Sequence, residues 1–133
     1  MGNEQLISFK TAKLAKEKGF DIPVLFCYNE NEEIGDVNDY MLINFNQFPT
    51  TVGSNTNMYS VPTQSLLQKW LRDVHNIVVT PITDFVTWEC NILHPDWNDE
   101  LILRKDDNGN WFNSYEDALE EGLYEALNQL IIK

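Results

Sequence analysis

The sequence contains little of the chemistry on which most enzymes depend. It has two cysteines and two histidines in 133 residues, and its six glycines are too scattered to form a phosphate-binding loop. No apolar run approaches the ~20 residues needed to cross a membrane. Residues 1–6 lack the charged and apolar regions of a signal peptide. We therefore expect a cytoplasmic protein without a membrane span or a cofactor, and the sequence favours a non-enzymatic role.

Basic residues are also scarce. Lysine and arginine number 9 against 21 aspartates and glutamates, which gives a net charge of −12. A chain of this charge repels phosphate backbones over long range, so direct binding of DNA or RNA is disfavoured. The same charge favours a basic protein partner, or it only keeps the protein dispersed in solution. Composition alone leaves both possibilities open.

The two cysteines, Cys27 and Cys90, both lie in apolar runs typical of strands. Two buried thiols in a reducing cytosol are the favoured interpretation, and a single bridge between neighbouring strands is the alternative. A nucleophile–base pair would need His75 or His94 beside one of them. The chain has none of the local motifs that accompany such pairs, so we expect the cysteines to pack in the core.

The last twenty residues carry the clearest positive signal. Ser114 and Asp117 form a Ser-x-x-Asp cap, and apolar residues then recur at helical spacing as far as Ile131. This pattern predicts a helix with one face docked on the core and one acidic face. The acidic face comprises Glu116, Asp117, Glu120, Glu121 and Glu125.

Two more helices are expected. Ser8 caps a helix that runs to Gly19, a residue suited to the position after a helix end. Pro62 or Thr63 begins a second helix, which has a broad apolar face and ends at His75. A histidine near a helix C-terminus meets a favourable dipole, so His75 has an ordinary structural explanation.

Between the helices, apolar runs predict short strands, and segments 29–39 and 46–60 read as loops. Pro81 is expected to stop one of these strands. Asn108 and Gly109 are typical of a tight hairpin turn, because both tolerate positive φ angles. The predicted strands cover residues 22–28, 40–45, 77–80, 85–93, 101–104 and, briefly, 111–112.

The order of elements is therefore α-β-β-α-β-β-β-α in a single domain over residues 1–133. Most strand connections are too short for a crossover helix, so neighbouring strands should be antiparallel. The fold class predicted is α+β, a mostly antiparallel sheet of about five to six short strands covered by three helices. Any uncovered part of the leucine-rich helix faces would make a homodimer possible.

One polar loop contains potential metal ligands. His94, Asp96 and Asp99 lie in the segment 94–100, and they offer nitrogen and oxygen donors to Zn²⁺ or Mn²⁺. A small metal-dependent hydrolase centred on this loop is therefore one alternative function. No second histidine stands at helical or hairpin spacing beside His94, and a solvated turn stiffened by Pro95 explains the same residues.

Charge is segregated along the chain, since the first helix holds four lysines and the last is acidic. The two helices could pair internally, or the acidic helix could bind a basic protein or imitate nucleic acid and block a basic host factor. Trp97 lies in a polar turn and is the aromatic residue most suited to an exposed contact. The predicted contact residues are Trp97, Glu116, Glu120, Glu121 and Glu125.

Three segments, 11–20, 58–75 and 114–123, resemble small uncharacterised proteins encoded by phages, prophages and genomes of gut anaerobes. The resemblance covers about half of the chain and implies no activity, ligand or catalytic residue. It implies an accessory protein of a mobile element. The expected function is that of a small acidic accessory protein that acts by protein–protein contact.

Overall fold

The computed structural model describes residues 4–35, 41–48 and 57–130. These ranges hold three α-helices, one 3-10 helix and six short strands, which confirms the α+β class. The elements follow in the expected order, with one additional strand before the second α-helix. Among the helices in these ranges, none combines the length and apolar character needed to cross a bilayer. In chain order the elements are α1 (Phe9–Glu17), β1 (Phe26–Tyr28), β2 (Ile34–Gly35), η1 (Phe45–Gln47), β3 (Tyr59–Val61), α2 (Gln64–His75), β4 (Val78–Thr83), β5 (Trp88–Leu93), β6 (Leu101–Leu103) and α3 (Tyr115–Asn128).

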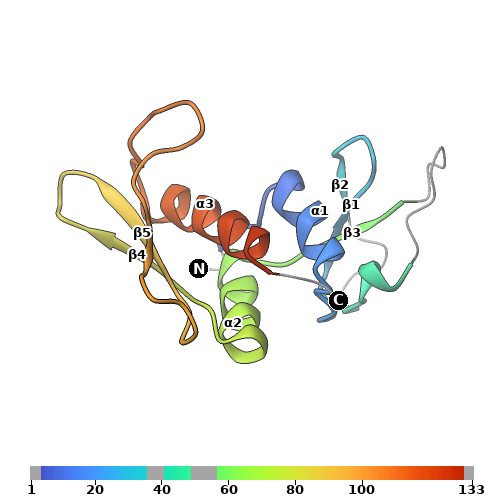
Figure 1. Ribbon diagram of the computed structural model, residues 1–133. Helices are drawn as coiled ribbons and strands as arrows, with labels where there is room; N and C mark the ends of the chain where they lie inside the picture. The colour runs from blue at the N-terminus through green and yellow to red at the C-terminus, as the bar shows by residue number, and fades with distance from the viewer. Residues whose placement is uncertain (1–3, 36–40, 49–56, 131–133) are drawn as a thin grey trace.

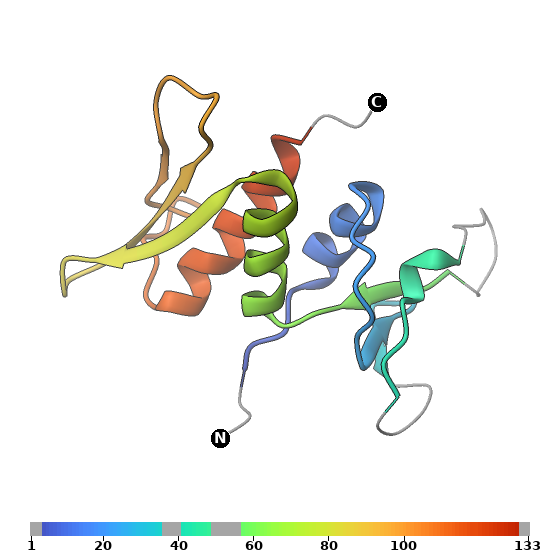
Figure 2. The same cartoon turned by 90° about the horizontal axis from the view of Figure 1, so that it is seen from below.

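The six strands form two sheets rather than the single sheet expected. Their orders are β2-β1-β3 and β4-β5-β6, and all neighbouring strands are antiparallel. The sheets lie on opposite sides of the helices (Figures 1 and 2). Helix α3 packs on β4 and β5 and contacts α1 and α2, while α1 packs on β3. The predicted sheet is divided because β1 pairs with β2 and β3, not with a strand from the second half of the chain.

The predicted caps Ser8 and Ser114 are confirmed, and Thr63, which was predicted as a possible first residue of the second helix, is its N-cap. The side chains of Ser8, Thr63 and Ser114 each accept a hydrogen bond from the backbone N–H three residues further on. These bonds satisfy N–H groups that have no partner inside the helix. At the other end of α1, Gly19 has φ +92°, and Asn76 after α2 has φ +58°. Both residues are of types that tolerate the left-handed region, so they end their helices at little cost.

The early strands differ most from expectation. Of the segment 40–45, Tyr40 lies outside the described residues, and Ile43 forms an isolated bridge to Val24 before the chain turns into η1. The hairpin partner of β1 is instead β2, within the predicted loop 29–39. Strand β3 begins inside the other predicted loop, 46–60, and all three of its residues are buried. A strand of two or three residues is too short to produce a detectable alternation.

Strand β4 continues through Pro81, although the sequence predicted that this proline would end the strand. Pro81 lies opposite Cys90 in the β4–β5 register, and pairing extends to Thr83. Because β4 is at the edge of its sheet, the missing N–H of a proline need not remove a hydrogen bond between strands. The predicted turn at 107–110 is confirmed, since Gly109 has φ +82° and the Asp106 N–H donates to the Asn110 carbonyl at 2.9 Å.

The two cysteines lie in different sheets, and no disulfide joins them. Cys27 belongs to β1 and is half-buried, whereas Cys90 belongs to β5 and is fully buried beneath α3. Burial raises the pKa of the Cys90 thiol to about 12, so the group stays protonated. Both residues therefore fit the expectation of reduced, packed thiols.

Candidate functional site

Glu120, predicted as an exposed contact residue, is half-buried and holds the helices together. Its Oε2 atom accepts hydrogen bonds from the Ser8 N–H at 3.1 Å, the Ser8 hydroxyl at 2.9 Å and the Thr11 hydroxyl at 2.5 Å. Its Oε1 atom accepts from the Gln64 side-chain amide at 3.1 Å. The carboxylate lies at the N-terminus of α1, where the helix dipole favours negative charge. Glu120 therefore connects α3 to both α1 and α2.

The partners of Glu120 are themselves removed from solvent. Thr11 is fully buried, and Gln64 is almost fully buried and also donates to the Glu116 carbonyl at 3.0 Å. A carboxylate with four donors is well satisfied, and charge-assisted bonds of this kind are stronger than neutral ones. Two polar residues near the starts of apolar helix faces, Thr11 and Gln64, were the features of the sequence that could have indicated this junction. Glu120 is therefore engaged within the chain, and a contact of Glu120 with an outside partner stays a prediction.

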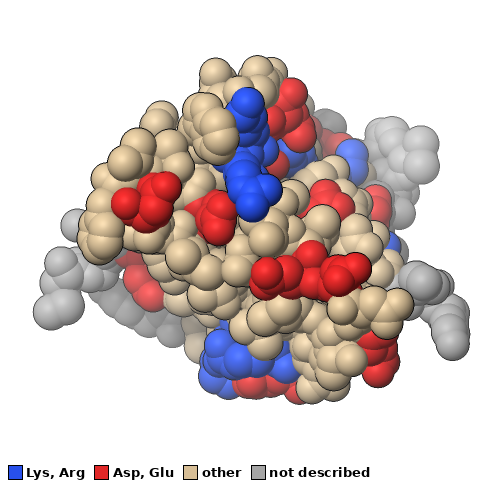
Figure 3. All heavy atoms as spheres, turned by 60° about the vertical axis from the view of Figure 1, so that its left-hand side comes forward, with Lys and Arg blue, Asp and Glu red and all other residues tan. Residues whose placement is uncertain are grey.

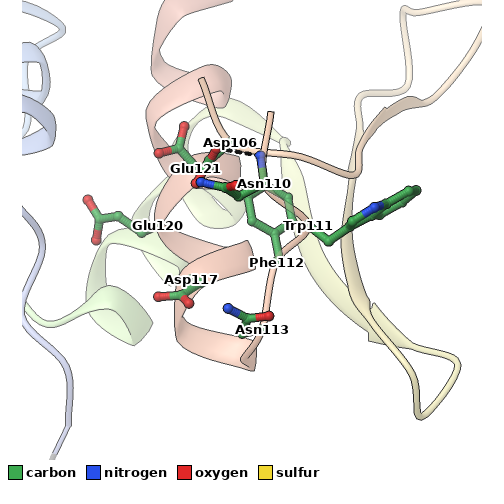
Figure 4. A pocket seen from close by; sticks show the side chains of 8 residues that line it. All are labelled: Asp106, Asn110, Trp111, Phe112, Asn113, Asp117, Glu120 and Glu121. Carbon is green, nitrogen blue, oxygen red and sulfur yellow. Dashed lines mark hydrogen bonds between the residues drawn. The ribbon is translucent and has the colours of Figure 1, made fainter. Parts of the chain in front are cut away.

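A hollow of about 490 Å³ lies beside this junction, between α3 and the segment 106–113 (Figure 4). Phe112, which is buried, forms its floor, and the Trp111 side chain points away from the acidic side chains. Carboxylates approach it from two directions, since Asp106 comes from the hairpin turn and the others from α3. The polar residues that line it are Asp106, Asn110, Asn113, Asp117, Glu120 and Glu121.

The hollow has more negative charge than its surroundings neutralise. Burial raises the pKa of Glu121, and the carboxylates of Asp107, Glu120 and Asp106 raise it further, against the lowering effect of Lys10. The Lys10 ammonium lies 3.5 Å from Asp107 Oδ2 and 4.0 Å from Glu121 Oε1. One lysine therefore faces several carboxylates, and the site retains a net attraction for cations.

Lys16 of α1 and Lys18, the residue that caps its end, are engaged away from α3 side chains. Lys16 donates to the carbonyls of Phe48 and Met58 at 2.7 and 2.8 Å, and burial lowers its pKa. Lys18 donates to the Leu130 carbonyl at 2.7 Å. Internal pairing of the basic and acidic helices is thus limited, among the described side chains, to the contacts of Lys10 with Glu121 and with the Tyr124 ring.

Two further hollows extend the acidic surface along the first half of α3. One of about 620 Å³ is lined in part by Glu116, Asp117 and Glu120, and one of about 360 Å³ by Glu4 and Glu116. Glu125 lines none of these hollows, and its Oε1 accepts from the Gln129 side chain at 2.9 Å. Of the four predicted glutamates, Glu116, Glu120 and Glu121 thus line the acidic hollows, and Glu125 does not.

The predicted metal loop is closed on itself. His94 Nδ1 accepts a hydrogen bond from the Asp96 N–H at 3.0 Å, and its ring lies 5.4 Å from that of Trp97. In the part of the chain that the structure describes, no three His, Cys, Asp or Glu side chains converge closely enough to hold a metal ion. Trp97 is half-buried and packs against the core instead of standing free, and Asp99 is exposed.

Comparison with known proteins leaves the geometry as the basis for any assignment. No protein-family model matches this sequence, and neither curated proteins nor solved structures give a significant match.

Proposed function

We propose that this chain is a non-enzymatic accessory protein that binds a basic protein partner through the acidic hollow beside α3. The observation that carries the proposal is the combination of a buried aromatic floor, Phe112, with rim carboxylates from Asp106, Asp117 and Glu121. A lysine or arginine of the partner can reach into the hollow and place its charged group among the carboxylates.

Lys10 provides an internal example of such binding. Its ammonium lies near two carboxylates and 4.1 Å from the centre of the Tyr124 ring. The raised pKa of Glu121 supports the same proposal, because a second cation in the hollow would favour its ionised form. An organic cation fits the wide hollow better than a bare metal ion, since the described carboxylates do not converge on one point.

The biological setting is part of the proposal. The resemblance of segments 58–75 and 114–123 to phage- and prophage-encoded proteins supports an accessory role in a mobile element. The partner would then be a basic protein of the host or of the element itself, met in the cytoplasm.

Affinity capture from a lysate of the native host, followed by quantitative mass spectrometry, tests this function. The wild-type chain is compared with the double variant Asp117→Asn/Glu121→Gln and with a matched control, Asp21→Asn/Glu32→Gln, which removes the same charge at exposed positions. We expect a protein with a basic surface to be retained by the wild type and the control and lost from the hollow variant.

Equal retention by all three chains would contradict the proposal. Equal loss of the partner from both variants would show that net charge, and not the hollow, determines binding, which also contradicts it. Addition of double-stranded DNA during capture separates a third possibility. A partner that DNA displaces would support imitation of nucleic acid by the same carboxylates.

A further inference from the structure

The outer face of the sheet β4-β5-β6 is uncovered. Along β4, Val79 is buried towards α3, whereas Val78, Thr80 and Ile82 alternate with it and are exposed. Leu93 lies opposite Val78 in the register and is also exposed. In Figures 1 and 2 the helices lie on the other side of this sheet. The side that carries the sheet shows charged groups in separate patches on a largely uncharged surface (Figure 3).

Apolar exposure is concentrated on this face. At the tip of the β4–β5 hairpin, Phe85 is 95% exposed and Val86 is 86% exposed. Single exposed apolar residues are ordinary, but a contiguous group on a monomer usually marks an interaction site. The exposed large apolar residues on the face and at its two ends are Val78, Ile82, Phe85, Val86 and Leu93.

The hairpin tip is held in a conformation that keeps these side chains in solvent. Phe85 has φ +73°, a value that is rare and unfavourable for an aromatic residue. The Thr83 hydroxyl accepts from the Phe85 N–H, and Asp84 Oδ1 accepts from the N–H groups of Val86 and Thr87, all at 2.9 Å. The tip projects away from the helices (Figure 1). The turn is thus built to present two apolar side chains.

The face is complementary to itself under a two-fold rotation. Val78 and Leu93 form an apolar group at one end, and Phe85 and Val86 form another at the hairpin end. Between them the outer face carries Thr80 opposite Asn91 and Ile82 opposite Glu89, so three of these four central residues are polar. Rotation about an axis through this polar centre places each hairpin tip on the Val78–Leu93 end of the other copy, as a closed two-fold interface requires.

The charged residues next to β6 also differ between the two ends of the sheet. Arg104 and Lys105 follow β6 at the hairpin end, because Leu103 lies opposite Cys90. Asp99 and Glu100 precede β6 near the Leu93 end. The same rotation therefore sets basic against acidic residues, an arrangement that specifies orientation. Asp84 adds a negative charge at the tip, where it is engaged with backbone N–H groups, and Arg104 lies 3.2 Å from Glu89. An anionic membrane, by contrast, would repel a chain of charge −12.

We propose that the protein forms a two-fold dimer through the outer face of β4-β5-β6, with each Phe85–Val86 tip seated on the Val78–Leu93 end of the other copy. The interface shares no residue with the acidic hollow, so the dimer and the binding of a basic partner stand or fall separately. The helix faces, from which a dimer was first expected, are largely buried among the described residues, with Val74 of α2 exposed.

Sedimentation velocity over a concentration series tests the dimer. The wild-type chain should shift with concentration towards twice its 15.5 kDa mass. Phe85→Asp and Val78→Lys should each remain monomeric, because each places two charges against apolar surface. An equimolar mixture of the two variants should restore a heterodimer, which pairs the new charges with each other at one contact and keeps the native contact at the other.

Ile34→Lys, an exposed apolar position in the other sheet, is the matched control and should dimerise like the wild type. Aspartate tolerates positive φ, so Phe85→Asp is expected to keep its fold, which far-ultraviolet circular dichroism verifies. A wild type that stays monomeric, variants that dimerise unchanged, or a mixture that stays monomeric would each overturn the proposal.

Discussion

Gly122 of α3 and Cys90 of β5 touch so closely that a β-carbon at position 122 would overlap the Cys90 sulfur atom. The same β-carbon would lie 2.9 Å from Cγ1 of Val79 on β4. Glycine costs about 1 kcal/mol relative to alanine in a helix interior, so this contact explains its presence in the middle of α3. The helix approaches the sheet to a distance that only a residue without a side chain permits.

Gly122→Ala should therefore destabilise the protein, although alanine is the better helix former. Overpacking of a core typically costs about 1–3 kcal/mol, which exceeds the gain in helix propensity. Urea denaturation measures the change. Gly35→Ala is the control, because a β-carbon there meets no atom within 4 Å. Addition of Cys90→Ala to Gly122→Ala should recover part of the loss, and a Gly122→Ala protein more stable than the wild type would contradict the packing argument.

Glu120→Ala should destabilise the fold by about 2–3 kcal/mol, because it leaves buried donors on Thr11 and Gln64 without an acceptor. Glu120→Gln should cost less, since an amide keeps one oxygen. Glu125→Ala, on the same helix but outside the junction, should change stability by no more than about 0.5 kcal/mol. Chemical denaturation of the three variants distinguishes them. Similar losses for Glu120→Ala and Glu125→Ala would show that the carboxylate does not join the helices.

The charge on Glu121 should reduce stability at neutral pH. Because burial raises its pKa in the folded protein, stability is lost as pH rises from the unfolded pKa, about 4.3, through the folded value. Glu121→Gln should thus be more stable than the wild type at pH 7, by up to about 1 kcal/mol. The difference should disappear below about pH 4. Melting temperatures across this range measure it, and a variant less stable at pH 7 would mean that the contact with Lys10 dominates.

The Cys90 thiol should resist alkylation in the folded protein. Its pKa of about 12 and its full burial leave almost no thiolate at mildly alkaline pH. In a Cys27→Ser background, iodoacetamide should modify Cys90 only after denaturant is added. Mass spectrometry of native and unfolded samples gives the result, and rapid native modification would require α3 to detach from β5.

The sequence was informative where a local pattern determines structure. Ser8 and Ser114 were recognisable as helix caps because capping needs only the next three residues, and the start of the second helix was placed at Pro62 or Thr63. Tertiary context decided the rest. Pro81 fits within a strand because that strand is at an edge, and β3 is a strand because of its neighbours. Alternation shows which residues share a face, but it does not say which strands pair, so two sheets could not be distinguished from one.

The residues of the candidate site show the same difference between what a local pattern predicts and what tertiary contacts decide. Glu116 and Glu121 face the acidic surface as the helical period predicted. Glu120 belongs to the same stripe, yet its partners come from positions 112 and 56 residues away in the chain. The helical period of a sequence shows which residues share a face, but it does not predict contacts between residues so far apart in the chain. The hairpin tip was missed because Phe85 was assigned to a strand, where an exposed aromatic residue on a positive φ angle is not expected.

The helices lie between two separate sheets, so the molecule has a boundary along which one sheet can separate from the rest. Strands β1 and β3 are attached chiefly through α1, and the Glu120 carboxylate fastens the start of that helix to α3. Rupture of this junction, together with the contacts of Lys10 with Glu121 and of Lys18 with Leu130, would release the first sheet as a unit while β4 and β5 stay folded on α3. Hydrogen exchange would then divide the chain into an earlier-opening half and a later-opening half, with the boundary near the connection between β3 and α2.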